Sequence, residues 1–388
     1  MKSKLVFLVA GYALTVSFAL SLQFLPPIIP ELRTTLRMTA GQAGMLMSSL
    51  ALFGIVVSSF VGYLTDRWGV RTVGLLGLVL VLMAEAWFAI STTYAGLLGA
   101  RLVMGVGAAT LSILGAQIIT QHFGGTARIG LAMGVMNTGV PMGVLISQLL
   151  FAPLAARSGW QAPVWVCCAF TALVLVAFAA FFPRTTAPRP SSPSLWSSLR
   201  HLDRRLWLLG IVWMFWNAGC LILLTFANDL LVTRGLTPRA AGLLAAMLMT
   251  FPVLGSPSMG HFLEHHHLQR AGMIAASLGF AVCSVLVGLF EGGVVPLFLG
   301  VSFCFALGPT GVFGLAPHIL RENETGLGYG VLSALLNVGV LFGPAVGGIV
   351  RDVTGSYLAS FVMAAVLTVI GAGFVLLIRP TAPGRESI

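Results

Sequence analysis

The sequence predicts an all-α membrane protein with twelve transmembrane helices in two pseudo-symmetric six-helix bundles. Hydrophobic residues make up 57% of the 388 residues and charged residues only 8%, whereas a soluble domain carries about 25% charge. Most of the chain falls into apolar runs of about 20 residues, the length at which a helix crosses the hydrocarbon core. These runs lack the short alternating pattern of a membrane β-barrel.

Twelve such runs follow one another along the chain. The first has a basic start, and we interpret it as a retained helix because it is long enough to span and no clear small-residue cleavage site precedes Pro26. The predicted spans are 5–25, 41–63, 72–91, 96–121, 128–154, 162–182, 206–228, 239–262, 271–290, 295–319, 326–350 and 357–378.

The longest connection runs from Pro183 to Arg205 and is rich in Pro, Ser and Arg, a composition typical of a linker. It divides the chain into two halves of six spans. We therefore predict an N-terminal bundle over 1–184, a cytoplasmic linker over 185–205 and a C-terminal bundle over 206–388.

Lys and Arg are distributed unevenly between the two sets of loops. If the N-terminus is cytoplasmic, most of them fall on the cytoplasmic side, which is the positive-inside bias of inner-membrane proteins. This predicts a cytoplasmic-membrane protein with both termini in the cytoplasm. The basic residues are scattered through short loops, so the net charge of +10 does not indicate a nucleic-acid partner.

The two halves contain related segments. The fifth span reads NTGV from residue 137 with a glycine at 143, and the eleventh reads NVGV from residue 337 with a glycine at 343. A weaker echo relates Gly62 and Asp66 to Gly260 and Glu264 at nearly the same offset. The shared offset indicates duplication, and two six-helix halves in parallel repeat are a known transporter architecture.

The stretch GYLTDRWGVRT, from Gly62 to Thr72, lies between the second and third spans. It resembles the loop signature of the major facilitator superfamily, and the span count, linker and half-repeat extend the resemblance over nearly the whole chain. The resemblance implies a secondary transporter, usually monomeric, that alternates between inward-open and outward-open states around a small-molecule site.

The resemblance also implies a cytoplasmic gate in this loop. Asp66 would face the start of the eleventh helix, near Thr325, where the positive end of the helix dipole favours a carboxylate. The alternative is that these charges only hold the loop in the cytoplasm, and Val70 stands where the family usually has a second basic residue. The predicted gate residues are Gly62, Asp66, Arg67, Gly69 and Arg71.

Three residues are candidates for proton coupling. Arg101 opens RLVMGVG within the fourth span, which resembles a second signature linked to proton or substrate handling. A charge inside a span needs a partner or a wet cavity, and Glu85 lies at a similar predicted depth. Asp229 lies near the outer end of the seventh span. The alternatives are a structural ion pair or an arginine that snorkels to the interface.

Glycines recur in the fifth and eleventh spans. Those of the eleventh are four residues apart on one helical face and continue into a Gly-Pro-x-x-Gly-Gly pattern. Drug–proton antiporters of the family carry such a motif in the fifth span, which favours export, whereas the alternative is helix packing alone. The predicted packing residues are Gly139, Gly143, Gly339, Gly343, Pro344 and Gly347.

The family places the first, fourth, seventh and tenth helices around the cavity. Their polar and aromatic residues are mostly neutral here, which suits an amphipathic or weakly polar cargo, although Trp213 and Trp216 have lipid anchoring as an alternative. Nitrate carriers of the family bind the anion with arginines inside the second and eighth spans; here the second span has no arginine and the eighth has one only at its first residue, Arg239, which argues against nitrate. Candidate cavity residues are Tyr12, Ser17, Ser112, Gln117, Asn137, Trp213, Trp216, Asn217, Thr310 and Asn337.

The predicted function is proton-coupled export of a small organic molecule by a secondary transporter, with cargo, proton and membrane lipid as partners. Uptake of a small organic acid bound by Arg101 is the alternative, and a receptor with a transporter fold is a remote one. The five cysteines have no metal-ligand spacing, and the Gly-rich stretches lack the Gly-Lys-Ser/Thr of a phosphate loop. We therefore predict no enzymatic activity, cofactor or metal.

Overall fold

The computed structural model describes residues 2–123, 129–183, 202–320 and 325–378, and within these ranges it contains helices and no strand. The predicted linker lies outside the described residues up to residue 201. Among these residues eleven helices are long and apolar enough to cross a membrane, and there are twelve such spans when a bent helix pair is counted as one. The predicted all-helical membrane fold is therefore confirmed.

The first half contains seven helices and the second half the remainder. The first half comprises α1 (Lys2–Gln23), α2 (Leu25–Leu36), α3 (Ala40–Ile90), α4 (Tyr94–Phe123), α5 (Ile129–Asn137), α6 (Gly139–Ser158) and α7 (Gln161–Phe181). The second comprises α9 (Arg204–Thr233), α10 (Pro238–Ala246), η1 (Met247–Met249), α11 (Thr250–Leu254), α12 (Ser256–His265), α13 (Gln269–Leu289), α14 (Val294–Leu315), η2 (Ala316–His318), α15 (Thr325–Thr354) and α16 (Tyr357–Leu377).

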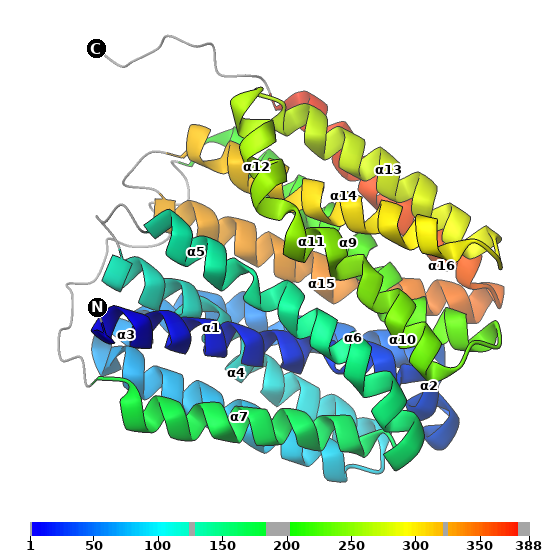
Figure 1. Cartoon of the computed structure of the whole chain (residues 1–388), viewed down its shortest axis with the longest axis horizontal. Helices are drawn as coiled ribbons and strands as arrows, with labels where there is room; N and C mark the ends of the chain where they lie inside the picture. Colours follow the sequence, from blue (N-terminus) through cyan, green and yellow to red (C-terminus); the bar gives the residue numbers. More distant parts are fainter. Residues whose placement is uncertain (1, 124–128, 184–201, 321–324, 379–388) are drawn as a thin grey trace.

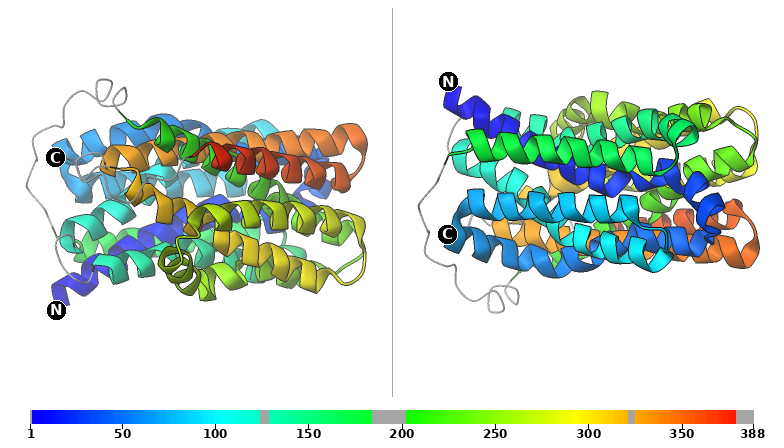
Figure 2. Two further views of the ribbon diagram at one scale, coloured as in Figure 1. Left: turned by 90° about the horizontal axis from the view of Figure 1, so that it is seen from above. Right: turned by 90° about the horizontal axis from the view of Figure 1, so that it is seen from below.

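The helices run roughly side by side along the long axis of the molecule (Figure 1, Figure 2). Most of the N-terminal half lies below the C-terminal half in the view of Figure 1. We call the end that holds the start of α1 the terminal end, and the opposite end, where α2 lies, the distal end. The halves meet where α3 packs on α15, α2 on α9, and α6 on α10. These contacts between halves position the site described below.

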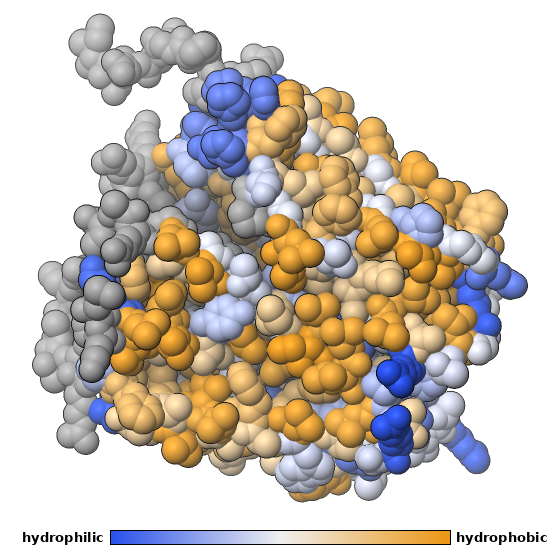
Figure 3. All heavy atoms as spheres, viewed as in Figure 1, coloured by the Kyte–Doolittle hydropathy of each residue, from blue (hydrophilic) through white to orange (hydrophobic). Residues whose placement is uncertain are grey.

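The outer surface of the bundle is apolar. Large hydrophobic side chains such as Met83, Leu150 and Leu173 are exposed, and Figure 3 shows apolar surface over the middle of the molecule with hydrophilic residues gathered toward its ends. In a soluble protein so much exposed apolar area would drive association. A lipid bilayer is the solvent that this surface fits.

Two spans differ from the sequence prediction. The first span extends to Leu36 because α2 continues beyond Phe24, although Pro26 and Pro27 break the hydrogen-bond ladder. The eighth span is broken and bent by 52° between Pro238–Leu254 and Ser258–His265. Before this break, in the first turn of α11, the backbone N–H of Phe251 donates to Ser302 Oγ of α14 at 2.9 Å, so a neighbouring helix satisfies a group at the start of α11.

Gly69 separates the second and third spans within α3. Its φ of 78° and ψ of 153° fall in a region that is essentially restricted to glycine. The turn in the predicted gate loop therefore depends on a residue without a Cβ atom.

We expect Gly69→Ala to lower the free energy of unfolding by about 1–3 kcal/mol, because alanine is strained in this conformation. Thermal unfolding of the purified protein in detergent measures the loss. Gly134→Ala on α5 is the matched control, since a Cβ there meets nothing within 4 Å and alanine favours a helix. Equal unfolding midpoints for the two variants would contradict this reading of the turn.

Candidate functional site

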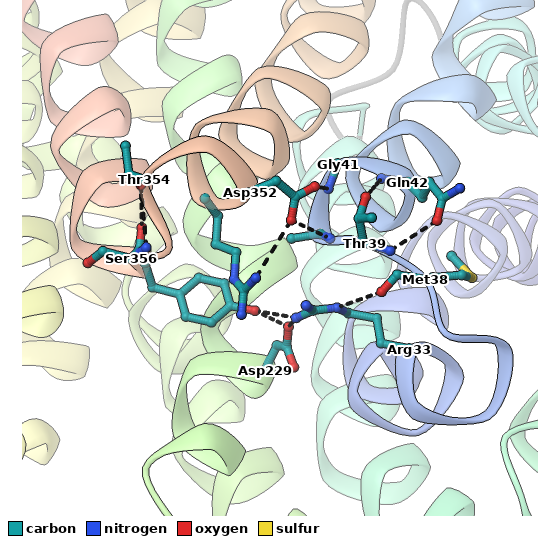
Figure 4. Close-up of polar contacts among 12 residues, drawn as sticks. Arg33, Met38, Thr39, Gly41, Gln42, Asp229, Asp352, Thr354 and Ser356 are labelled. Carbon is teal, nitrogen blue, oxygen red and sulfur yellow. Dashed lines mark hydrogen bonds and ion pairs between the residues drawn. The ribbon is translucent and has the colours of Figure 1, made fainter.

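A buried ion pair joins the two halves at the distal end. Arg33 of α2 pairs with Asp229 of α9, and the Tyr357 hydroxyl at the start of α16 donates to the same carboxylate (Figure 4). Arg33 also donates to Tyr357 Oη at 2.6 Å and to the backbone carbonyl of Met38 at 3.3 Å. Because Arg33 belongs to one half and Asp229 to the other, the halves cannot separate here without breaking this pair.

A second carboxylate contact lies beside the first. Asp352, near the end of α15, accepts hydrogen bonds from the backbone N–H groups of Ala40 at 2.9 Å and Gly41 at 2.6 Å, which begin α3 (Figure 4). These N–H groups have no partner within their own helix, and the helix dipole there favours a negative charge. The end of α15 is therefore held against the start of α3.

The backbones of α3 and α15 touch along this contact. A Cβ built on Gly44 would lie 2.1 Å from the Pro344 carbonyl oxygen, and one on Gly348 would lie 2.3 Å from that of Ala40. The backbone N–H of Ala345 also donates to Ser48 Oγ at 3.1 Å. A side chain at Gly44 or Gly348 would not fit between the two helices, so their contact closes one side of the distal end.

The α6 helix closes the other side against α9 and α10. The Asn228 amide donates to Gln148 Oε1 at 2.5 Å between the halves. A Cβ on Gly242 of α10 would lie 2.4 Å from the Gln148 carbonyl oxygen. Together with the two carboxylate contacts, this brings the halves together around the distal end.

Arg101 lies deep within the N-terminal half and is fully buried. Its guanidinium donates to three backbone carbonyls, those of Ser21 at 2.6 Å, Leu46 at 3.0 Å and Met47 at 3.4 Å. It also lies over the ring of Phe24, 5.3 Å from the centroid. These contacts use the fork of donors that only arginine offers, and they leave the group inaccessible to a cargo in this state.

Ser21 connects Arg101 to Glu85, and the two charged groups form no ion pair within 4 Å in the described structure. Ser21 Oγ lies 3.0 Å from Glu85 Oε1 and 2.8 Å from the carbonyl oxygen of Ser17, while the Ser21 carbonyl accepts from Arg101. The Glu85 carboxyl group is fully buried, and the side chain of Thr171 on α7 also hydrogen-bonds to it. The expected direct partnership is therefore an indirect one.

The predicted gate loop is described only in part. Arg71 donates to the carbonyl oxygen of Ala179 on α7 at 2.5 Å, and Arg67 is exposed. The surroundings of Gly62, the side chain of Asp66 and the side chains at the start of α15 lie outside what the structure describes. The expected contact between Asp66 and Thr325 is therefore not part of the described structure.

The candidate cavity residues fall into two groups. Trp213 and Trp216 are buried within the C-terminal half, where Trp213 packs on Phe313 and Trp216 on Phe280, so neither is a lipid anchor. Ser17 is also buried, and the side chain of Asn137 lies outside the described residues. The half-buried candidates are Tyr12, Ser112, Gln117, Asn217, Thr310 and Asn337.

The candidate packing glycines lie against helices of their own half. A Cβ on Gly143 would lie 2.5 Å from Ala19 Cβ of α1, and Gly139 faces Thr15 of the same helix. On α15, Gly339, Gly343 and Gly347 face α9 at 2.2 to 2.8 Å. Asn337 of α15 lies against Gly54 of α3, at the meeting of the halves.

Sequence reasoning missed four residues of the distal contacts: Arg33, Gln148, Asp352 and Tyr357. The predicted first and second spans, 5–25 and 41–63, leave Arg33 in the connection between them. For Asp352 a signal existed, because it ends the eleventh span much as Asp66 ends the second. Nothing in the local sequence distinguishes Gln148 or Tyr357 from other polar residues in apolar runs.

The chain is similar to known proteins over nearly its whole length. The family model described as Major Facilitator Superfamily matches residues 11–235 and 213–388. The nitrite extrusion protein of Bacillus subtilis (strain 168) is 24% identical over 379 residues, which cover 96% of this chain and 91% of that protein. The protein named "Probable nitrate transporter NarT" of Staphylococcus aureus (strain JH9) is 25% identical over 350 residues, covering 88% and 87%.

Two solved structures share the fold. A crystal structure of a variant of nucleoside transporter NupG has a TM-score of 0.75 at 14% identity and covers 96% of this chain and 98% of its own. The human organic anion transporter MFSD10 has a TM-score of 0.70 at 18% identity, with coverage of 95% and 99%. At these identities the similarity concerns the fold alone.

Proposed function

The chain belongs to the Major Facilitator Superfamily, and we propose that it couples proton entry to the export of a small organic molecule by alternating access. As a member of this family it is a secondary transporter of the inner membrane and not an enzyme. The main observation in support of alternating access is the set of contacts between the halves at the distal end. An alternating-access transporter closes one end of its bundle at a time, and these contacts close the distal end.

We propose that the distal end faces outward. The uneven distribution of Lys and Arg supports a cytoplasmic terminal end. In this orientation the described state is closed to the outside, and the proposed partner state closes the terminal end instead. The Asp352 contact with the start of α3 supports this symmetry, because Asp66 is proposed to contact the start of α15 at the opposite end of the same helix pair.

Proton coupling is proposed at Glu85. A hydroxyl group has one proton, so Ser21 cannot donate to both Ser17 and Glu85. When Ser21 donates to Glu85, either form of the carboxyl group fits; when Ser21 donates to the carbonyl of Ser17 instead, its contact of 3.0 Å with Glu85 requires the carboxyl group to be the donor. A proton on Glu85 fits both arrangements and avoids a buried charge without an ion-pair partner, which supports the protonated form in this state. Arg101 holds Ser21 in place.

A small organic molecule is the proposed cargo because the half-buried candidate residues are neutral and partly aromatic. The name of the Bacillus subtilis relative supports export. Nitrate or nitrite is the second candidate, favoured by the names of the relatives that match nearly the whole chain. Against it, the second span carries no arginine, and Arg239 of the eighth lies exposed at the start of α10.

The test of coupling is Glu85→Gln. The glutamine amide can donate to Ser21 as a protonated carboxyl group does, but it cannot release a proton. We expect export driven by a pH gradient in proteoliposomes to fall to the level of empty vesicles, while cargo exchange without a gradient continues at a rate within about threefold of the wild type. Glu291→Gln, on an exposed loop, is the matched control. Gradient-driven export that survives Glu85→Gln would remove Glu85 from the coupling mechanism.

A further inference from the structure

Two buried amides meet between the halves just inside the Arg33–Asp229 pair. Gln148 of α6 and Asn228 of α9 are 0% and 1% exposed. Asn228 directly precedes Asp229 in the sequence, and Ser147, next to Gln148, donates to the carbonyl oxygen of Gln23 at the end of α1. The amide pair is therefore at the convergence of three helices around which the distal end opens and closes.

This pair leaves half of its hydrogen-bonding groups unused. Among the described residues, Gln148 Nε2 and Asn228 Oδ1 have no partner, although the two side chains bond to each other at 2.5 Å. Two further buried oxygens lack a partner among the described residues: Gln23 Oε1, in the residue whose carbonyl accepts from Ser147, and Thr225 Oγ1, one helical turn before Asn228. Buried polar groups in native proteins are nearly always satisfied, so the two free groups of this amide pair indicate a missing partner.

The chemistry that the pair offers does not depend on how the amides are oriented. If Asn228 donates to Gln148, one amide nitrogen and one amide oxygen remain; if both amides are flipped, again one nitrogen and one oxygen remain. No charged side chain takes part in these contacts. The pair therefore presents one donor and one acceptor, both neutral.

We propose that Gln148 and Asn228 are specificity-determining residues that bind cargo with a hydrogen-bond donor beside an acceptor on one edge, as in a primary amide, a lactam or a protonated carboxylic acid. The proposal rests on the transport function proposed above and names the substrate class of that site. When the halves separate at the distal end, the bond between the amides breaks and both side chains face the opened cleft. When the distal end closes, the bond between the two amides forms again. The amides therefore bind either the cargo or each other.

The inference distinguishes organic cargo from inorganic anions. Nitrate and nitrite carry acceptors only, so they can accept from the amide nitrogens of the separated side chains but have no hydrogen to donate to the amide oxygens. A ligand with both groups satisfies both. A preference for donor–acceptor edges is therefore expected at this site.

The test is a comparison of exchange in proteoliposomes that contain the full chain, with nicotinamide, N,N-dimethylnicotinamide and nitrate as probes. Nicotinamide carries a donor beside an acceptor, and its dimethyl analogue lacks the donor. We expect nicotinamide to exchange with a half-saturating concentration about tenfold below that of the analogue, the equivalent of one lost hydrogen bond. Gln148→Leu and Asn228→Leu are each expected to abolish this preference.

Gln269→Leu is the matched control, because Gln269 is a buried glutamine of α13 that packs on α14 inside one half, and it should leave the preference intact. A ratio between probes that Gln148→Leu and Asn228→Leu do not change would overturn the inference, since an effect on gating alone alters all rates together. So would exchange of nitrate with no exchange of either amide. Failure of all probes in a protein that exchanges no solute would instead refute the transport function.

Discussion

Asp229→Asn is expected to open the distal end about a hundredfold more often than the wild type. The substitution leaves the Arg33 guanidinium largely buried without its counter-charge, and breaking one partner of a buried pair costs about 3 kcal/mol or more. In the opposite state both groups would be hydrated, so this cost falls on the closed state alone. A difference of 1.4 kcal/mol corresponds to a tenfold change in population.

The measurement is the labelling rate of a single cysteine at Ala152, in a background without the five natural cysteines, by a membrane-impermeant maleimide. Ala152 is buried on α6 beside Gly242 of α10, so it becomes accessible only when the halves separate. Asp203→Asn is the control, because Asp203 pairs with Arg205 within one half and both side chains are 33% exposed. Exposed pairs contribute little, so this variant should label at the wild-type rate.

The double variant Arg33→Gln/Asp229→Asn removes both charges and leaves none buried alone. It should therefore increase labelling less than Asp229→Asn does by itself. Labelling of Asp229→Asn at the wild-type rate, or an equal increase in the Asp203 control, would show that the ion pair does not hold the distal end closed.

Arg101→Lys is expected to lower the free energy of unfolding by about 2–4 kcal/mol and to be worse than Arg101→Met. A lysine ammonium is a compact, strongly hydrated charge that cannot reach all three carbonyls at once, and each hydrogen bond to a charged group contributes about 1.5–3 kcal/mol. Methionine loses the same bonds but buries no charge. Lysine is therefore expected to lower the free energy of unfolding more than methionine does, although lysine conserves the charge.

Thermal unfolding in detergent measures this order. Arg204→Lys, at an exposed position at the start of α9, should behave as the wild type. If Arg101→Lys matched that control, the three carbonyl contacts would not be important for stability. If methionine were worse than lysine, the buried charge itself would have to be favourable, in contradiction to the assigned role of the guanidinium in holding α1 against α3 and α4.

The fold was predictable because a bilayer imposes a simple rule on sequence. Apolar runs of fixed length, separated by short charged loops, locate the spans without knowledge of any contact. The same rule misplaced the end of the first span. Pro26 and Pro27 usually end a helix, but α2 continues past them to Leu36 and carries Arg33 to Asp229.

Only those site residues that stand out in the local sequence could be predicted. Glu85 and Arg101 stand out as charges in apolar runs, yet their link through Ser21 depends on helix packing that no local pattern encodes. The partners of the distal contacts are far apart in the chain, as Ala40 and Asp352 illustrate. The amide pair shows the same limit, because its significance lies in unsatisfied groups that only the packed structure reveals.

The most direct test of the account is uphill flux in proteoliposomes of the wild-type chain. Vesicles are loaded with nicotinamide, weak acids, amphipathic cations or nitrate, and an inward proton gradient is imposed. The account predicts that an organic solute leaves against its concentration gradient, that protons enter with it, and that a protonophore stops both fluxes. Solute binding without movement under any gradient, or efflux that a protonophore leaves unchanged, would contradict proton-coupled export.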